Sequence, residues 1–235
     1  MKLFLVALSC LAALALAEEP LRFYHENAGI QQAELIRQTE QALDFDGARI
    51  VGGSAANLGQ YSYIGGLVIT LENGQTSVCG SSLLTNNRLV TAAHCWWDGR
   101  NRARQFVVVL GSTRLFSGGT RITTTNVVMH GSWNPNTLAN DVAVISTGWI
   151  NYNNNIRNIG LASGSNSFQG AWAQAAGFGR TAGISNNQFL SHVSLQVIGN
   201  AECQRTFGNV IIGSTLAPAV PEAGVPARET PVALS

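Results

Sequence analysis

Residues 91–95 read Thr-Ala-Ala-His-Cys, and the fold can be inferred from this stretch. It ends the short β-type run Arg88–Thr91, so we expect His94 to lie just past the end of a strand. Most histidines are packed core or surface residues, and three others have no comparable context: His25, His130 and His192. We therefore interpret His94 as a candidate for proton transfer, which histidine performs near neutral pH.

Two further motifs carry an aspartate and an arginine. Asp141, in Asn140-Asp141-Val142-Ala143-Val144, precedes an apolar run, and a charge at the start of a buried strand needs a partner. The second motif, Arg49-Ile50-Val51-Gly52-Gly53, offers an Arg-Ile bond that a protease specific for arginine can cut. The Arg-Ile motif is weak evidence alone, but it is strong evidence in combination with a signal peptide, a pro-length segment and the downstream His94 and Asp141.

Together the three motifs resemble the chymotrypsin-like serine proteases of the trypsin family, and residues 209–216 resemble insect (lepidopteran midgut) chymotrypsins. The resemblance implies that His94 is the general base and that Asp141 orients its ring. It also implies that cleavage after Arg49 frees the ammonium of Ile50, which in the family orders the specificity pocket. Protein or peptide substrates are expected, with no metal and no cofactor.

The composition favours a packed, turn-rich β protein. Of the 235 residues, 46% are hydrophobic, 11% are charged and 25 are glycine, which suits one all-β domain with processing segments. We expect a chymotrypsin-like double six-stranded β-barrel whose second barrel is incomplete. The expected strands are 61–70, 78–84, 88–91, 105–110, 121–130, 141–146, 171–178, 189–198 and 210–215, with a short helix at 200–207.

Two processing segments are expected before the domain. Residues 1–17 read as a signal peptide, because a basic start and a short apolar run precede Ala15-Leu16-Ala17. The apolar run is shorter than the ~20 residues of a membrane-spanning helix, so we expect secretion, into the gut lumen, and no membrane partner. Residues 18–49 read as an acidic pro-segment with a weak amphipathic helix, whose apolar residues are Ile30, Ala33, Leu35, Ile36 and Leu43.

Secretion means that the cysteines should pair. Cys10 leaves with the signal peptide. Cys79 and Cys95 flank the segment that carries His94, and a disulfide between them should contribute ~3 kcal/mol. Cys203 is then unpaired, which is consistent with missing sequence, a free thiol or an intermolecular bond.

All basic residues after the signal peptide are arginines, because Lys2 is the one lysine. Arginine keeps its charge at a higher pH than lysine, so an alkaline environment would explain the bias, and codon or lineage bias would explain it equally well. Three arginines cluster at 100, 102 and 104 without aromatic or motif context, which favours a solvated loop over a nucleic-acid site.

The resemblance runs from Ile50 to Leu216 and stops there. In the family a cysteine follows, which would pair with Cys203, but here the next residue is Ala217. Residues 217–235 are rich in proline and show no period, so we expect a non-homologous, disordered tail. Gly-Asp-Ser-Gly-Gly, which carries the nucleophile, does not occur in the sequence, and Ser214 lies in an expected strand rather than a tight turn.

Two hypotheses of different classes follow. The first is a secreted digestive zymogen of the serine endopeptidase family, inactive as written because the sequence lost its C-terminal part by frameshift, mis-splicing or a wrong gene model. Its partners would be substrates, a trypsin-like activating protease and protease inhibitors. The second is a catalytically silent homologue that acts as a binding or regulatory protein. An unrelated β-barrel binding module would make the three motifs a coincidence.

Overall fold

The computed structural model describes residues 22–46, 56–164, 168–178, 189–199, 201–202, 205 and 217–218. The expected signal peptide, the Arg49–Ile50 bond, Cys203 and most of the expected tail lie outside these residues. No helix among the described residues is long and apolar enough to cross a membrane.

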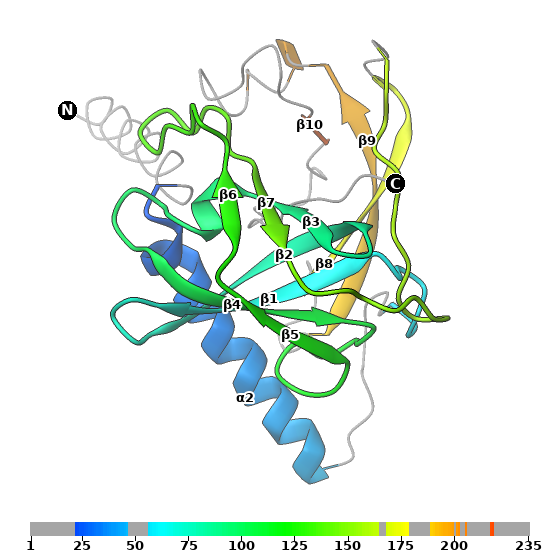
Figure 1. The fold of residues 1–235 in the computed structure, drawn as a ribbon. Helices are drawn as coiled ribbons and strands as arrows, with labels where there is room; N and C mark the ends of the chain where they lie inside the picture. Colours follow the sequence, from blue (N-terminus) through cyan, green and yellow to red (C-terminus); the bar gives the residue numbers. More distant parts are fainter. Residues whose placement is uncertain are drawn as a thin grey trace, which may run out of the picture.

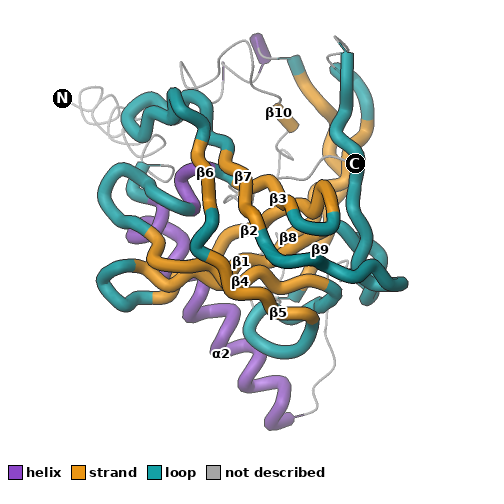
Figure 2. The backbone as a smooth tube through the Cα atoms, in the orientation of Figure 1, coloured by secondary structure: helices purple, strands orange, loops and turns teal. Residues whose placement is uncertain are grey.

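The described chain begins with a helical segment and continues as strands (Figures 1 and 2). The helical segment comprises a π-helical turn, η1 (His25–Gly29), and a helix, α2 (Ile30–Asp46). The remaining elements, in chain order, are β1 (Ile64–Leu71), β2 (Thr76–Thr85), β3 (Arg88–Thr91), the 3-10 turn η2 (Ala93–Cys95), β4 (Ala103–Leu110), β5 (Thr120–Thr124), β6 (Val127–Met129), β7 (Ala143–Ser146), β8 (Trp172–Phe178), β9 (Leu190–Ile198) and β10 (Ala217–Pro218).

The first seven strands form one curled sheet in the order β5-β4-β1-β2-β3-β7-β6. Its two end strands, β5 and β6, are consecutive in the chain and pair with β4 and β7 respectively. The sequence predicted one strand over 121–130. The structure interrupts this strand at Thr125–Asn126, where the Ser146 amide donates to the Asn126 carbonyl (2.8 Å), so that the two parts pair at opposite ends of the curled sheet.

The barrel encloses an apolar core because its strands alternate inward and outward residues. In β1, Leu67, Ile69 and Leu71 are fully buried. Leu67 is opposite Cys79 of β2 on one side and Val108 of β4 on the other. The core also contains Leu83, Leu89, Phe106, Leu110 and Ile145.

A second sheet lies beside the barrel, in the order β10-β9-β8. The pairing of β8 with β9 is antiparallel and continuous from Trp172–Gln196 to Phe178–Leu190. Ala217 and Pro218, which we expected in the tail, pair with Ile198 and Val197. The fold is thus the expected chymotrypsin-like arrangement, with a curled seven-stranded sheet as the first barrel and a smaller second sheet.

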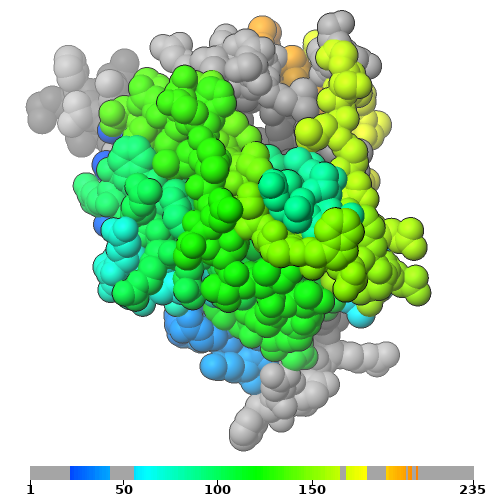
Figure 3. All heavy atoms as spheres, viewed as in Figure 1, coloured from blue at the N-terminus to red at the C-terminus, as the bar shows by residue number. Residues whose placement is uncertain are grey.

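The first part of the segment 22–46 packs against the barrel, and the last turns of α2 project below it (Figures 1 and 3). In Figure 3 the blue residues of α2 emerge at the lower edge of the green barrel. Ala33 and Ile36 join a second apolar cluster with Val78, Leu115 and Phe178. This cluster therefore links the helix, the first barrel and the second sheet. Leu35, which we expected on the apolar face, is instead 42% exposed.

The barrel core predicts a stability difference between two large-to-small substitutions. Leu67→Ala should lower the free energy of unfolding by about 2–5 kcal/mol, because it leaves a cavity in a closely packed interior. Val128→Ala, on a β6 side chain that is 64% exposed, should change it by less than about 0.5 kcal/mol. Urea unfolding followed by tryptophan fluorescence measures both, and equal losses would contradict this core assignment.

Candidate active site

The pairing of β3 with β7 brings His94 and Asp141 together. These strands are antiparallel, with Thr91 opposite Ala143 at one end of the ladder. His94 follows β3 by three residues and Asp141 precedes β7 by two, so both emerge at the same end of the barrel. We had expected the strand to begin at Asp141. It begins at Ala143, which leaves Asp141 in the preceding loop.

The Asp141 carboxylate binds His94 at two points. Its Oδ1 accepts a hydrogen bond from the His94 backbone amide at 2.8 Å, and its Oδ2 lies 2.6 Å from His94 Nδ1. An ionised carboxylate only accepts, so Nδ1 carries the proton. The lone pair of the neutral ring is therefore on Nε2, where a base needs it. Two bonds to one carboxylate also fix the ring orientation.

Asn140, the residue before Asp141, has a left-handed backbone conformation that directs Asp141 towards His94. Asn140 has φ 59°, a conformation that asparagine tolerates better than most residues. Its side chain donates to the Ser132 carbonyl at 2.9 Å, and its own carbonyl accepts from the Val142 amide at 2.8 Å. These bonds hold the loop before β7 and offset the cost of the conformation.

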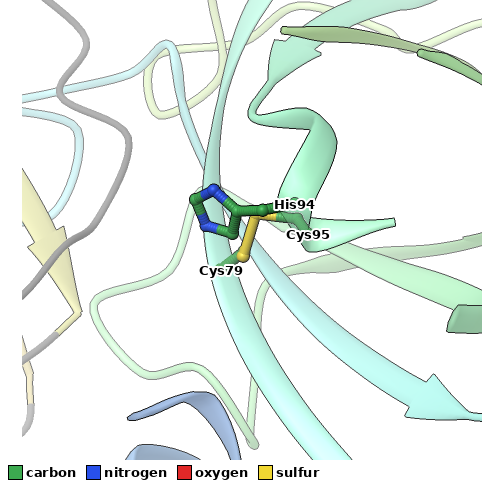
Figure 4. Close-up of side chains that lie close together, drawn as sticks. All are labelled: Cys79, His94 and Cys95. Carbon is green, nitrogen blue, oxygen red and sulfur yellow. A yellow bond between two sulfur atoms is a disulfide. The ribbon is translucent and has the colours of Figure 1, made fainter. Parts of the chain in front are cut away.

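The disulfide beside the site joins Cys79 of β2 to Cys95 of η2, as we expected (Figure 4). It ties the turn that carries His94 to the neighbouring strand. The ligand atoms of Cys79, Cys95 and His94 lie within 4.8 Å of one another. Because both sulfur atoms form the disulfide, this cluster has no thiolate that could bind a metal ion.

His94 is covered by Tyr24, a residue of the N-terminal segment. The two ring centroids are 4.5 Å apart with an interplanar angle of 49°. Tyr24 is itself buried, and its hydroxyl donates to the Val78 carbonyl at 2.8 Å. His94 is 6% exposed, and its Nε2 is buried. The candidate base is thus closed to solvent in this state.

A second histidine, His25, lies fully buried next to this group. Its Nδ1 is 2.8 Å from Ser77 Oγ, and its backbone amide donates to Asp98 Oδ2 at 2.9 Å. Burial lowers the pKa of His25 from 6.5 to about 4, because desolvation and the nearby His94 outweigh the attraction of Asp98. His25 is therefore neutral at physiological pH. No motif or periodicity around His25 predicted this burial.

The comparisons with known proteins agree with this geometry. The family model "Trypsin" matches residues 50–221. Collagenase of Hypoderma lineatum is 34% identical over 172 residues, and the match covers 72% of this chain and 64% of the collagenase. "Trypsin, alkaline A" of Manduca sexta is 35% identical over 169 residues, with 69% and 64% covered.

Among solved structures, HL collagenase superimposes with a TM-score of 0.65 at 33% identity, covering 72% of this chain and 73% of that one. The chain belongs to the trypsin family of chymotrypsin-like serine proteases. It spans about 64% of the length of the curated collagenase that it matches.

The hydrogen bonds at Asp141 predict the tautomer of His94. In the unmodified protein the neutral ring should carry its proton on Nδ1, and Asp141→Asn should move it to Nε2, because the amide can present an N–H to the ring. Nitrogen-15 NMR of the imidazole distinguishes the two forms. His130, whose Nδ1 accepts from the Ser132 amide at 3.1 Å, is an internal reference with the opposite tautomer. An unchanged His94 spectrum in Asp141→Asn would refute the assignment.

Proposed function

We propose that this protein is a secreted zymogen of a chymotrypsin-like serine endopeptidase, in which His94 is the general base and Asp141 orients it. The 2.6 Å contact between His94 Nδ1 and Asp141 Oδ2 is the observation that supports it. In this role His94 Nε2 takes the proton of the attacking hydroxyl and later gives it to the leaving amine. Asp141 stabilises the imidazolium that forms in between.

The motif that carries the nucleophilic serine in the family is not found in this sequence. Gly-Asp-Ser-Gly-Gly does not occur among the 235 residues. Loss of the nucleophilic serine costs on the order of 10⁶ in kcat in a related mechanism, which corresponds to roughly 8–9 kcal/mol of transition-state stabilisation. A polypeptide of these 235 residues alone should therefore not hydrolyse peptides, although Asp141 orients the ring of His94.

Activation and location are part of the same proposal. Cleavage between Arg49 and Ile50 by a trypsin-like protease would free a new N-terminus, and residues 1–17 would direct the chain out of the cell. The gut lumen is the proposed workplace. One relative is named an alkaline trypsin of Manduca sexta, which supports an alkaline environment for this protein too. All basic residues after Lys2 are arginines, which keep their charge at high pH.

A chimera tests the roles of His94 and Asp141. Residues 1–216, joined to the C-terminal part of an active relative that supplies the serine and oxyanion donors, should hydrolyse a peptide amide once the chain has been cleaved after Arg49 and separated from its N-terminal segment. His94→Ala should abolish this activity, and Asp141→Asn should lower kcat by about 10⁴, the order known for the equivalent change in a trypsin-like triad.

Two controls accompany the chimera. The 235-residue chain should be inactive in the same assay, and chimeric His130→Ala, which alters an exposed histidine, should retain full activity. A folded chimera whose activity survives His94→Ala would overturn the proposal. A folded but inactive chimera would favour a catalytically silent homologue with a binding or regulatory role.

A further inference from the structure

One face of the protease domain receives the segment 22–46 through specific polar contacts at two separate places. The first place is the loop between β4 and β5, and the second is the loop after η2. Between them the apolar side chains of Ala33 and Ile36 enter the second cluster. Burial of these apolar side chains favours binding of the segment to the domain, and the polar contacts make that binding specific for this segment.

At the first place the loop 112–117 forms a carboxylate site that is occupied by Glu40 of α2. The carboxylate is 97% buried, since Glu40 is 3% exposed. It accepts hydrogen bonds from the backbone amides of Leu115 and Phe116 and from Ser117 Oγ (3.1 Å). A buried charge is stable only with such donors, and the buried amide of Leu115 in turn needs an acceptor.

This loop is shaped independently of Glu40. Ser112 Oγ accepts from the Arg114 amide at 3.0 Å and donates to the Ser117 carbonyl at 3.2 Å. Arg121 donates to the Leu115 carbonyl at 2.9 Å. These bonds lie within the domain and hold the loop in the conformation in which its two amides face the Glu40 carboxylate.

At the second place, Asp98 binds the start of the segment. Asp98 is 2% exposed, and its Oδ1 accepts from the amides of Arg100 and Asn101 at 2.9 and 2.7 Å. Its Oδ2 accepts from the amide of His25. Arg100 also reaches Glu26 of the segment at 2.8 Å and lies over the Phe23 ring at 4.0 Å.

Close approach at Gly29 completes the fit. A Cβ atom there would lie 2.0 Å from Ser77 Oγ and 2.9 Å from the Tyr24 ring, so no larger residue fits without displacement. The absence of a side chain lets the backbone rest on β2, and this contact places Tyr24 against His94.

We propose that the protease domain carries a binding site for its own residues 22–46, and that the bound segment inhibits the protein by covering His94. The binding does not depend on the proposed function, whereas the inhibition rests on His94 acting as the base. The contacts lie between residues 23 and 40, upstream of the Arg49–Ile50 bond. Cleavage of that bond leaves them in place, so release of the segment is a separate step in activation.

The burial of His25 makes this release sensitive to acid. The groups that face its ring are Asp98, Ser77 and His94 on the domain, with Tyr24 beside it on the segment. Burial in the bound segment lowers the pKa of His25 from its ordinary value of 6.5 to about 4. Protonation of His25 therefore favours the released segment, and binding weakens as the pH falls below about 6.5.

This pH dependence can be measured on a chain with a site for a sequence-specific protease inserted between Arg49 and Ile50. After cleavage, gel filtration should show the segment bound to the domain at pH 8 and weaker binding at pH 5. His25→Asn should lower the affinity at pH 8 and remove most of the pH dependence. Equal pH dependence with and without His25 would overturn this part of the proposal.

Reaction of His94 with diethyl pyrocarbonate tests the cover in the intact chain, without reference to activity. Peptide mapping by mass spectrometry should show slow modification of His94 and fast modification of the exposed His130. Glu40→Gln should accelerate modification of His94 by about tenfold to hundredfold, the equilibrium equivalent of one lost hydrogen bond to a charged group. Gly29→Ala should also accelerate it, because the added methyl group collides with Ser77 and Tyr24. The matched controls Glu34→Gln, on the exposed face of the same helix, and Gly131→Ala, with open space around its Cβ, should not.

Hydrogen exchange on the same variants distinguishes release from unfolding. Faster exchange should be confined to residues 22–42 and to the amides of Leu115 and Phe116, while β1, β2 and β4 stay protected. Loss of protection throughout the barrel would show that the segment is an integral part of the fold, and would overturn the proposal. Fast modification of His94 in the unmodified chain would overturn it as well. Failure of the chimera to hydrolyse peptides would refute only the proposed function.

Discussion

The carboxylate of Asp141 is the group on which the site depends. It joins the loop before β7 to the turn after β3 through two hydrogen bonds to one residue, His94. This arrangement requires that β3 and β7 pair in register. The interruption at Thr125–Asn126 and the disulfide at Cys95 support the same geometry from either side. Small displacements of β3 or β7 would therefore change the position of the His94 ring.

Two buried carboxylates hold the N-terminal segment on the domain. Asp98 and Glu40 are nearly inaccessible, and each is satisfied by backbone amides and by contacts between the segment 22–46 and the domain. Such contacts are costly to leave incomplete. The segment is thereby fixed in one position, and that position places Tyr24 on His94. We propose that this acidic segment acts as a ligand with a defined geometry.

Much of the fold and the two central site residues could be predicted from the sequence. The strand runs, the His94 and Asp141 motifs and the Cys79–Cys95 pair are local patterns with known physical consequences. The interruption within 121–130 was missed because the alternation of residues continues through it, whereas the pairing of its two parts with β4 and β7 is a long-range requirement. The roles of Tyr24, His25 and Glu40 were missed for a similar reason. Their burial depends on partners about 50 to 75 residues away, and nothing in the helical period marks a glutamate as buried.

The barrel and Asp141 orient His94, and Tyr24 of the N-terminal segment covers it. Proton–proton distances between Tyr24 and His94 in the intact chain test both at once, because the contact exists only if the barrel and the segment adopt these positions. Nuclear Overhauser spectroscopy at pH 8 should show cross-peaks between the ring protons of Tyr24 and those of His94. Cross-peaks from Tyr24 to other parts of the protein, with none to His94, would contradict the account.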